Sequence, residues 1–200
     1  MKKIILTITA VFALAFVNAQ DKKDKKDGFS FSNGNFYLGG TVSYTSTDNG
    51  TVKTSGSSLS PEAGYFISDN FALTAMLSIG NTDNGVGTKT STFGIGAGGR
   101  YYFLNLGERF KTFTNFGLGY NSNDNGGNGA DKTSTITVGG GLGINYFVTS
   151  KLAIDFSLAN ILSYSSSKTG DVSTSSLNLD VNTYRNFFAT PTFGLIYKLN

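Results

Sequence analysis

Apolar and polar residues alternate along most of the chain after Phe36. Between Phe93 and Phe103, apolar residues occupy five of the six odd positions, while glycine and polar residues fill most positions between them. This period of two is typical of a β-strand with one apolar side, and no stretch keeps the period of about 3.6 residues that marks a helix. The pattern predicts eight strands, at about 36–44, 59–67, 71–79, 93–103, 116–120, 136–148, 152–158 and 193–199.

The connections between the predicted strands alternate in length. The short turns fall at 68–70, 105–109 and 149–150, and the longer polar loops at about 47–54, 81–89, 122–132 and 165–186. Tight turns at one end and long loops at the other are typical of an up-and-down barrel in an outer membrane. Because the strand number is even, both chain ends should lie on the same side, and we expect that side to be periplasmic.

Charged residues are sparse in the predicted barrel. From Gly28 onward, ten basic and ten acidic residues are spread over 173 positions, whereas a soluble surface is about a quarter or more charged. A soluble barrel or sandwich is the alternative, but its outward positions would need Lys and Glu, which are almost missing here. The pattern therefore favours a lipid-facing exterior.

Aromatic residues gather near the predicted strand ends, as expected for the two aromatic girdles of a membrane barrel. Those near the short turns are Tyr37, Tyr65, Phe66, Phe71, Tyr101, Tyr102, Phe103, Phe110, Phe113, Tyr146, Phe147 and Tyr197. Those near the long loops are Tyr44, Tyr120, Tyr164 and Phe187.

Residues 1–19 are predicted to be a signal peptide. Lys2 and Lys3 precede an apolar run at 4–17, and residues 17–19 offer small side chains at the cleavage position. A membrane-anchoring helix is the alternative, but about 14 apolar residues is short against the roughly 20 that span a bilayer.

Residues 20–35 are expected to form a charged flexible spacer before the barrel domain at 36–200. Residues 21–27 (DKKDKKD) carry a charge at every position and no apolar side chain, so they have nothing to bury. Attraction to an acidic surface is the alternative, although three Asp nearly cancel four Lys.

The secretory start ending at Ala19-Gln20, the hairpin spacing, the Gly-x-Gly-x-Gly strands and the final run TFGLIYKL resemble a known family. The chain is similar to the small outer-membrane β-barrel domain proteins of Bacteroidota type and, more broadly, to porin-like eight-stranded barrels of the OmpA/OmpX kind. The resemblance implies an all-β, eight-stranded antiparallel up-and-down transmembrane β-barrel in the outer membrane of a Gram-negative cell. It also implies membrane lipid and the barrel-assembly machinery as partners.

The final strand resembles a barrel-assembly signal. Its residues in that role are Thr192, Gly194, Tyr197 and Leu199, while Asn200 departs from the usual terminal aromatic residue.

The composition removes several classes of function. The chain has no cysteine and no histidine, which excludes disulfides, cysteine metal sites, a lipid-attachment thiol and every histidine-dependent nucleophile. The net charge of +3 is too small to indicate nucleic-acid binding. No cofactor or metal is therefore expected.

The inward positions of the predicted barrel carry a small set of ionisable and amide side chains. We expect a lumenal ion-pair cluster of Glu62, Arg100, Asn145, Asp155 and Lys198. The planar fork of arginine suits two carboxylates, and an eight-stranded barrel is just wide enough for side chains to fill it. A paired-carboxylate active site at Glu62 and Asp155 is the alternative, but it lacks a further catalytic partner.

Three neighbouring strands also present glycine inward. This predicted glycine wall consists of Gly94, Gly96, Gly98, Gly117, Gly119, Gly139, Gly141 and Gly143. One interpretation is close packing, with rings such as Tyr102 and Phe147 against the wall. The other is a hollow for a small apolar molecule, or a narrow conduit.

The first three long loops each contain Asp-Asn-Gly, at 48–50, 83–85 and 124–126. This sequence favours hairpin turns; calcium binding is the alternative, but the spacing of a dedicated calcium loop is missing. The fourth loop includes Leu177, Leu179 and Val181 in the register of the last strand, which predicts a strand extension whose edge could take a partner.

These features favour a non-catalytic integral outer-membrane β-barrel with a structural or surface-interaction role, whose outer loops could bind an extracellular protein. A narrow channel or binding barrel for small apolar solutes is the alternative. A large diffusion porin is excluded because it needs about 16 strands. Barrel lipases and proteases of familiar kinds rely on histidine, so an enzyme is not expected.

Overall fold

The computed structural model describes residues 28–126, 129–179 and 192–200. Its strands are β1 (Phe36–Asp48), β2 (Lys53–Ser68), β3 (Phe71–Asp83), β4 (Lys89–Leu106), β5 (Phe110–Asp124), β6 (Thr133–Phe147), β7 (Leu152–Thr169), β8 (Val172–Leu179) and β9 (Thr192–Lys198). The predicted signal peptide and the charged run at 21–27 lie outside the described residues.

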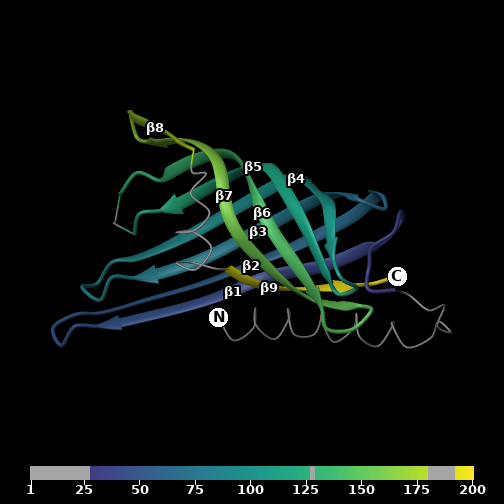
Figure 1. Cartoon of the computed structure of the whole chain (residues 1–200). Coiled ribbons are helices and arrows are strands. Elements are labelled where there is room, and N and C mark those ends of the chain that lie inside the picture. The colour runs from purple at the N-terminus through teal and green to yellow at the C-terminus, as the bar shows by residue number, and fades with distance from the viewer. Residues whose placement is uncertain (1–27, 127–128, 180–191) are drawn as a thin grey trace.

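The strands form a closed antiparallel barrel (Figure 1). Each strand from β1 to β7 pairs with the next, and β9 pairs with β7 on one side and β1 on the other. The outer half of β7 pairs instead with β8, so β8 and β9 together form the eighth strand of the barrel. The predicted all-β, eight-stranded antiparallel barrel is confirmed.

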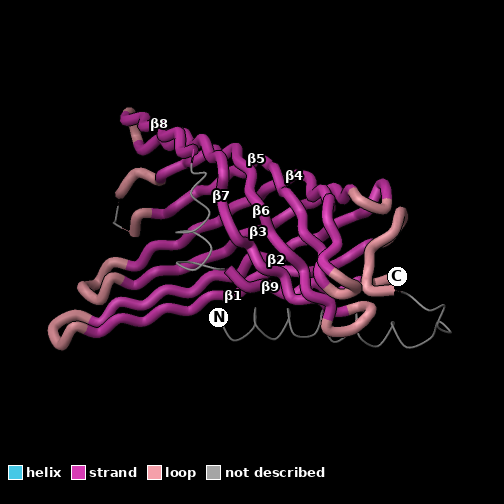
Figure 2. The backbone as a smooth tube through the Cα atoms, viewed as in Figure 1, coloured by secondary structure: helices cyan, strands magenta, loops and turns pink. Residues whose placement is uncertain are grey.

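The strands continue beyond the predicted apolar segments, so the long connections are shorter than expected. In Figure 2 the hairpins project at one end of the barrel, opposite the short turns. The Asp-Asn-Gly triplets form tight turns: Gly50, Gly85 and Gly126 have φ of 83°, 74° and 73°. Each glycine N–H donates to the aspartate two residues before it, at 2.8–2.9 Å. The prediction of turn chemistry is confirmed.

The predicted loop at 165–186 is wrong over its described part. Residues up to Thr169 continue β7, and Gly170, with φ of 55°, turns the chain into β8. Leu177 lies opposite Tyr164, and Leu179 opposite Leu162, so the strand extension predicted from Leu177 and Leu179 is confirmed in its described part. Val181 and residues 182–186, where an interruption was expected, lie outside the described residues.

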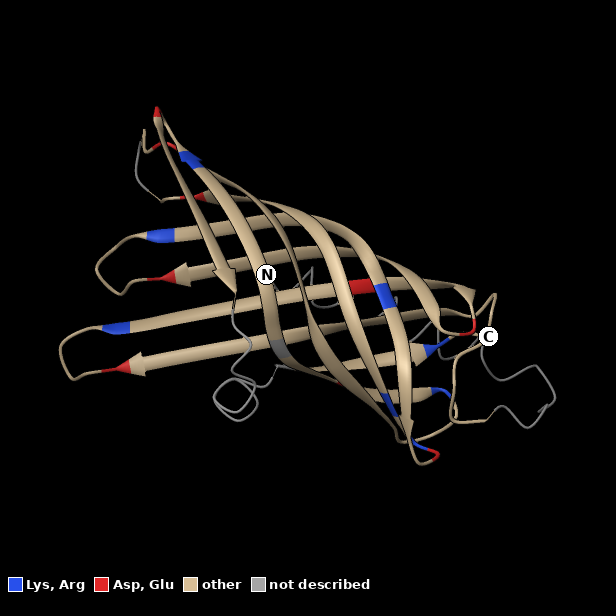
Figure 3. Ribbon diagram, turned by 45° about the horizontal axis from the view of Figure 1, so that its top comes forward, with Lys and Arg blue, Asp and Glu red and all other residues tan. Residues whose placement is uncertain are grey.

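An apolar belt covers the outside of the barrel. Val42, Ile95 and Leu118 are 77%, 54% and 63% exposed in the isolated chain, and moving each such side chain from water into lipid is favourable by about 1.5–3 kcal/mol. Figure 3 shows basic and acidic residues concentrated near the strand ends. No helix within the described ranges is long and apolar enough to cross a bilayer.

Only part of the aromatic girdle predicted near the short turns faces lipid. Tyr65, Tyr101 and Phe103 face outward and are exposed as predicted. Five other members point into the barrel and are buried: Tyr37, Phe66, Tyr102, Phe113 and Phe147. Of these, Tyr102 and Phe147 were also expected to point inward beside the glycine wall. Neighbouring positions on a strand face opposite sides, so a run such as Tyr101-Tyr102-Phe103 cannot all meet lipid.

The described end of the chain closes the seam between β9 and β1. The Asn200 side-chain oxygen accepts a hydrogen bond from the Phe36 N–H at 2.7 Å, and its amide donates to the Gly34 carbonyl at 3.1 Å. Tyr197, a residue of the predicted assembly signal, lies opposite Leu38 and Leu152. Thr192 and Gly194 belong to β9 and Leu199 follows it; their role in assembly stays a prediction.

Candidate functional site in the barrel interior

An aromatic plug fills the short-turn end of the lumen. It consists of Phe31 and the five buried aromatic residues Tyr37, Phe66, Tyr102, Phe113 and Phe147. Phe31 stacks on Phe66 with ring centroids 4.5 Å apart and contacts Tyr102 and Phe147 at 5.2 and 5.1 Å. Phe31 is only 6% exposed. Phe31, in the segment expected to end a flexible spacer, is therefore packed into the barrel, while Ser32 and Asn33 next to it are exposed.

Hydrogen bonds fasten this N-terminal segment to the barrel. The Gly34 N–H donates to the Phe66 carbonyl at 2.8 Å, and Lys198 Nζ donates to the Ser30 carbonyl at 3.2 Å. The Arg109 guanidinium lies 4.2 Å from the centre of the Phe29 ring. Lys198, predicted for the lumenal ion-pair cluster, is thus buried inside the barrel but contacts the plug segment.

Arg100 holds two carboxylates together beside the plug. Its Nη2 lies 3.0 Å from Glu62 Oε1 and its Nη1 lies 3.1 Å from Asp155 Oδ1. A second bond to Asp155 Oδ2, at 3.3 Å, makes that pair bidentate. The Phe113 ring covers one face of the guanidinium at 4.1 Å. Both carboxylates are therefore paired with arginine, and their negative charges are partly balanced inside the barrel.

Neutral side chains complete the network. Asn145 donates to Asp155 and accepts a 2.7 Å hydrogen bond from the Tyr102 hydroxyl, while the Tyr37 hydroxyl donates to Glu62 at 2.6 Å. The structure thus brings four of the five predicted cluster residues together, from four strands. Hydrogen bonds to both carboxylates offset part of the desolvation of these buried charges.

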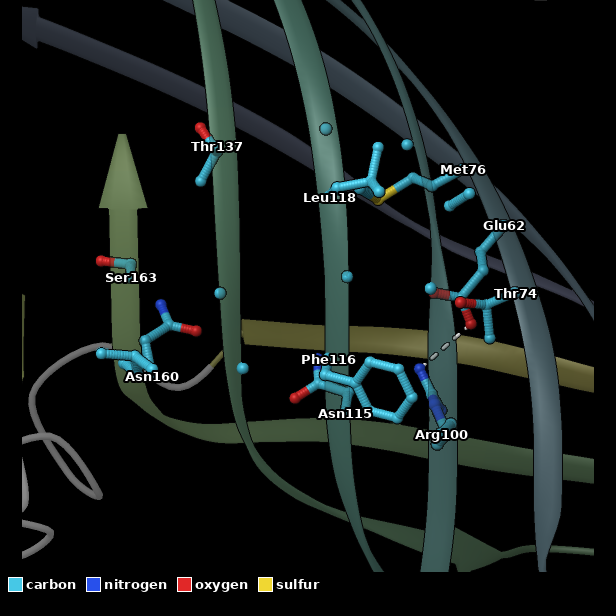
Figure 4. Close-up of a pocket in the computed structure, with 18 of the residues that line it drawn as sticks. Glu62, Thr74, Met76, Arg100, Asn115, Phe116, Leu118, Thr137, Asn160 and Ser163 are labelled. Carbon is cyan, nitrogen blue, oxygen red and sulfur yellow. Dashed lines mark hydrogen bonds and ion pairs between the residues drawn. The ribbon is translucent and has the colours of Figure 1, made fainter. Parts of the chain in front are cut away.

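A cavity of about 360 Å³ lies on the long-loop side of this cluster (Figure 4). Arg100 and Glu62 form its floor, and the hydrogen bond between them is drawn in the figure. Inward positions on the surrounding strands contribute amide, hydroxyl and thioether side chains: Thr74, Met76, Asn115, Asn121, Thr137, Asn160 and Ser163.

The predicted glycine wall divides between open space and close packing. Gly96, Gly98, Gly117, Gly119 and Gly139 line the cavity. By contrast, a Cβ on Gly143 would lie 2.1 Å from the Phe113 ring, and one on Gly94 would lie 2.0 Å from Asn121 Oδ1. Gly141, also on β6, is buried. Part of the wall thus borders the cavity, and part packs against side chains of other strands.

A second cavity of about 280 Å³ lies nearer the long loops and is lined by β1 to β4. Its lining is almost entirely hydroxyl, glycine and amide, including Ser43, Ser58, Ser78 and Thr92. The Ser43 and Ser58 hydroxyls are 2.7 Å apart. The inward surface is therefore polar from the floor to the long loops.

Sequence reasoning missed three contributors to this interior. Phe31 sits in a polar stretch, and its alternation with Phe29 was the only signal. Tyr37 was assigned to the girdle. Asn160 was missed because two irregularities in the pairing of β6 with β7 change the inward register there, and single-sequence periodicity does not show bulges.

The interior offers no clear metal site in the described part of the chain, where no group of three or more Asp and Glu side chains comes together. Its two lumenal carboxylates, Glu62 and Asp155, are both bonded to Arg100.

Comparison with protein families decides the identity of this barrel. Residues 7–184 match the family described as outer membrane protein beta-barrel domain. The chain belongs to this family. Its place is the outer membrane, where the apolar belt meets lipid and the polar interior is enclosed.

The chain is also similar to several solved structures. Neisserial surface protein A shares 21% identity, with 82% of this chain and 96% of that chain covered and a TM-score of 0.46. Outer membrane protein W of E. coli shares 15% identity, with 84% and 98% covered and a TM-score of 0.46. The N-terminal β-barrel domain of Pseudomonas aeruginosa OprF shares 14% identity, with 83% and 98% covered and a TM-score of 0.41. No curated protein matches the sequence significantly.

Proposed function

We propose that this protein is a non-catalytic outer-membrane barrel that acts as a structural element and through its outer surface, and that does not conduct ions through its lumen. The observation that carries the proposal is the double closure of the short-turn end, by the aromatic plug and by the Arg100 network. Phe66 and Phe147 are fully buried there, and Arg100 joins carboxylates from β2 and β7 across the lumen.

The absence of catalysis is part of the same proposal. Glu62 and Asp155 are the lumenal carboxylates, and each accepts hydrogen bonds from Arg100 and from one further side chain, Tyr37 or Asn145 respectively. Protonating either carboxylate would weaken its pair with the buried Arg100 guanidinium. These groups therefore serve to neutralise buried charge rather than to take up a proton.

Orientation and partners complete the proposal. The chain ends lie on the periplasmic side with the short turns, and the long hairpins face the medium, where they would meet an extracellular protein ligand. The barrel-assembly machinery recognises the final strand through Thr192, Gly194, Tyr197 and Leu199. The short-turn and long-hairpin ends that Figure 1 displays support this arrangement.

Planar-bilayer recording tests the closed lumen. The purified, heat-modifiable barrel should insert without producing discrete current steps, because the plug and the ion-pair network leave no continuous aqueous path. Steady single-channel steps from the folded monomer would overturn the proposal and favour a narrow channel. A 16-stranded porin inserted under the same conditions provides the positive control.

A further inference from the structure

The cavity above Arg100 carries polar groups that the protein itself does not use. The side-chain amides of Asn115, Asn121 and Asn160 line it, and within the described residues none of these three side chains hydrogen-bonds to another protein group. Such unpaired donors and acceptors converging on one hollow are what a polar ligand or ordered water satisfies.

Charge in the cavity disfavours an ionic occupant. Arg100 and Glu62 are the charged residues of the lining, and they already pair with each other at 3.0 Å. An anion would compete with Glu62 for the guanidinium, and a cation would compete with Arg100 for the carboxylate. Breaking a buried pair leaves an uncompensated charge, which is strongly unfavourable.

The lining also disfavours an apolar occupant. Met76 supplies the main apolar side chain from an inward position, whereas Phe116 and Leu118 alternate to the outer face and are 55% and 63% exposed. Thr74, Thr137 and Ser163 add hydroxyl groups. These groups would lose their hydration against a hydrocarbon without gaining hydrogen bonds.

Size and access limit the ligand further. The volume of about 360 Å³ lies near the lower end of the range for small-molecule pockets, roughly 300–1,000 Å³. The hydroxyl-lined cavity of about 280 Å³ lies farther along the same strands toward the long loops. A solute therefore reaches the site from the long-loop side.

We propose that the lumen is a blind binding site for a small uncharged solute that carries hydroxyl and amide groups, about the size of one sugar ring. Asn115, Asn121 and Asn160 exchange hydrogen bonds with it. The glycine wall provides the space, because any side chain at Gly117 or Gly119 would occupy it. The site does not depend on whether the outer surface binds a protein.

Three probes of similar size separate the chemistries: N-acetylglucosamine is uncharged, glucosamine is cationic and glucuronate is anionic. Binding to the full-length, folded barrel in detergent micelles is followed by calorimetry and by chemical-shift changes of amides on β4 to β7. We expect saturable binding of N-acetylglucosamine that is about tenfold or more tighter than binding of either charged sugar. No saturable binding of N-acetylglucosamine, or tighter binding of a charged sugar, would overturn the proposal.

Gly119→Leu and Ala75→Leu form a matched pair of variants. A Cβ at Gly119 would meet only the Ile95 carbonyl, at 3.6 Å, so a leucine there enters the cavity without disturbing the strands. Ala75 lies on the outward face of β3 and is exposed, so the same bulk is added to the lipid side. Gly119→Leu should weaken N-acetylglucosamine binding about tenfold, and Ala75→Leu should leave it unchanged.

Heat-modifiable migration confirms that both variants are folded before binding is compared. Equal affinity in the two variants would show that the sugar binds outside the lumen and would overturn the proposal. Conductance of the unmodified barrel is measured separately, so an open lumen and an empty site are distinguishable.

Discussion

The Arg100 side chain connects several strands across the narrow lumen. Its guanidinium pairs with Glu62 and Asp155 and stacks on the Phe113 ring, and the side chain is almost completely buried. Each of these contacts comes from a different strand, so the side chain ties β4 to β2, β5 and β7. The carboxylates in turn depend on it, since within the described residues Arg100 is the cation that pairs with Glu62 and Asp155.

Replacing Arg100 should therefore destabilise the barrel. Arg100→Ala leaves two carboxylates without their cation, and we expect the free energy of unfolding in detergent, measured with urea, to fall by about 3–5 kcal/mol. Lys89→Ala is the control, because the Lys89–Asp83 pair is exposed and an exposed pair contributes about 0–1 kcal/mol. Equal losses in the two variants would contradict a structural role for the network.

The N-terminal segment at 28–35 behaves as an element of the fold rather than as a linker. It has no helix or strand of its own, but Phe31 packs among the inward rings and Gly34 and Asn35 exchange backbone hydrogen bonds with Phe66. These two backbone hydrogen bonds attach the segment to the end of β2. Aromatic packing and backbone pairing thus replace regular secondary structure as the source of its order.

Phe31→Ala tests this element. Removing a buried phenylalanine from a packed site should lower the free energy of unfolding by about 3 kcal/mol and raise proteolytic cleavage near residue 31. Phe93→Ala, on the outward face and half exposed, removes the same ring from the lipid side and should leave cleavage at residue 31 unchanged. An unaltered cleavage pattern in Phe31→Ala would show that the plug does not hold the segment.

At the scale of the whole molecule, the two ends of the barrel differ. The short-turn end holds the plug, the Arg100 network and the inward aromatic residues, whereas the long-hairpin end opens onto hydroxyl-lined cavities. A barrel closed at one end and open at the other can hold a solute without passing it. The proposed periplasmic position of the closed end keeps the two compartments separate.

The absence of cysteine makes this orientation directly measurable. Val86→Cys places a thiol in the β3–β4 hairpin, where Val86 is 69% exposed, and Asn70→Cys places one in the short β2–β3 turn. In intact cells a membrane-impermeant maleimide should label Val86→Cys alone, and lysis should make Asn70→Cys reactive as well. Labelling of Asn70→Cys in intact cells would reverse the proposed orientation.

Much of the fold could be predicted because every strand of a membrane barrel alternates lipid-facing apolar residues with lumen-facing residues. Alternation at Phe93–Phe103 fixes which side faces lipid, and an inward Arg100 in an otherwise apolar strand requires a partner in the lumen. The same rule fails where the register changes, as at Asn160, and where a segment packs without periodicity, as at Phe31. Within β8, the alternation of Leu177 and Leu179 predicted a strand, whereas the run of hydroxyl residues before them shows no apolar alternation and was assigned to a loop.

The sequence by itself therefore determines the strand number, the lipid-facing belt, the Asp-Asn-Gly turns and the inward placement of Arg100, because each depends on neighbours along one strand. Only the tertiary structure decided which aromatic residues form the plug, which glycines border open space and which end of the lumen is closed. Those outcomes depend on the register between strands and on the path of the segment before β1. Such contacts join residues distant in sequence, and no local period encodes them.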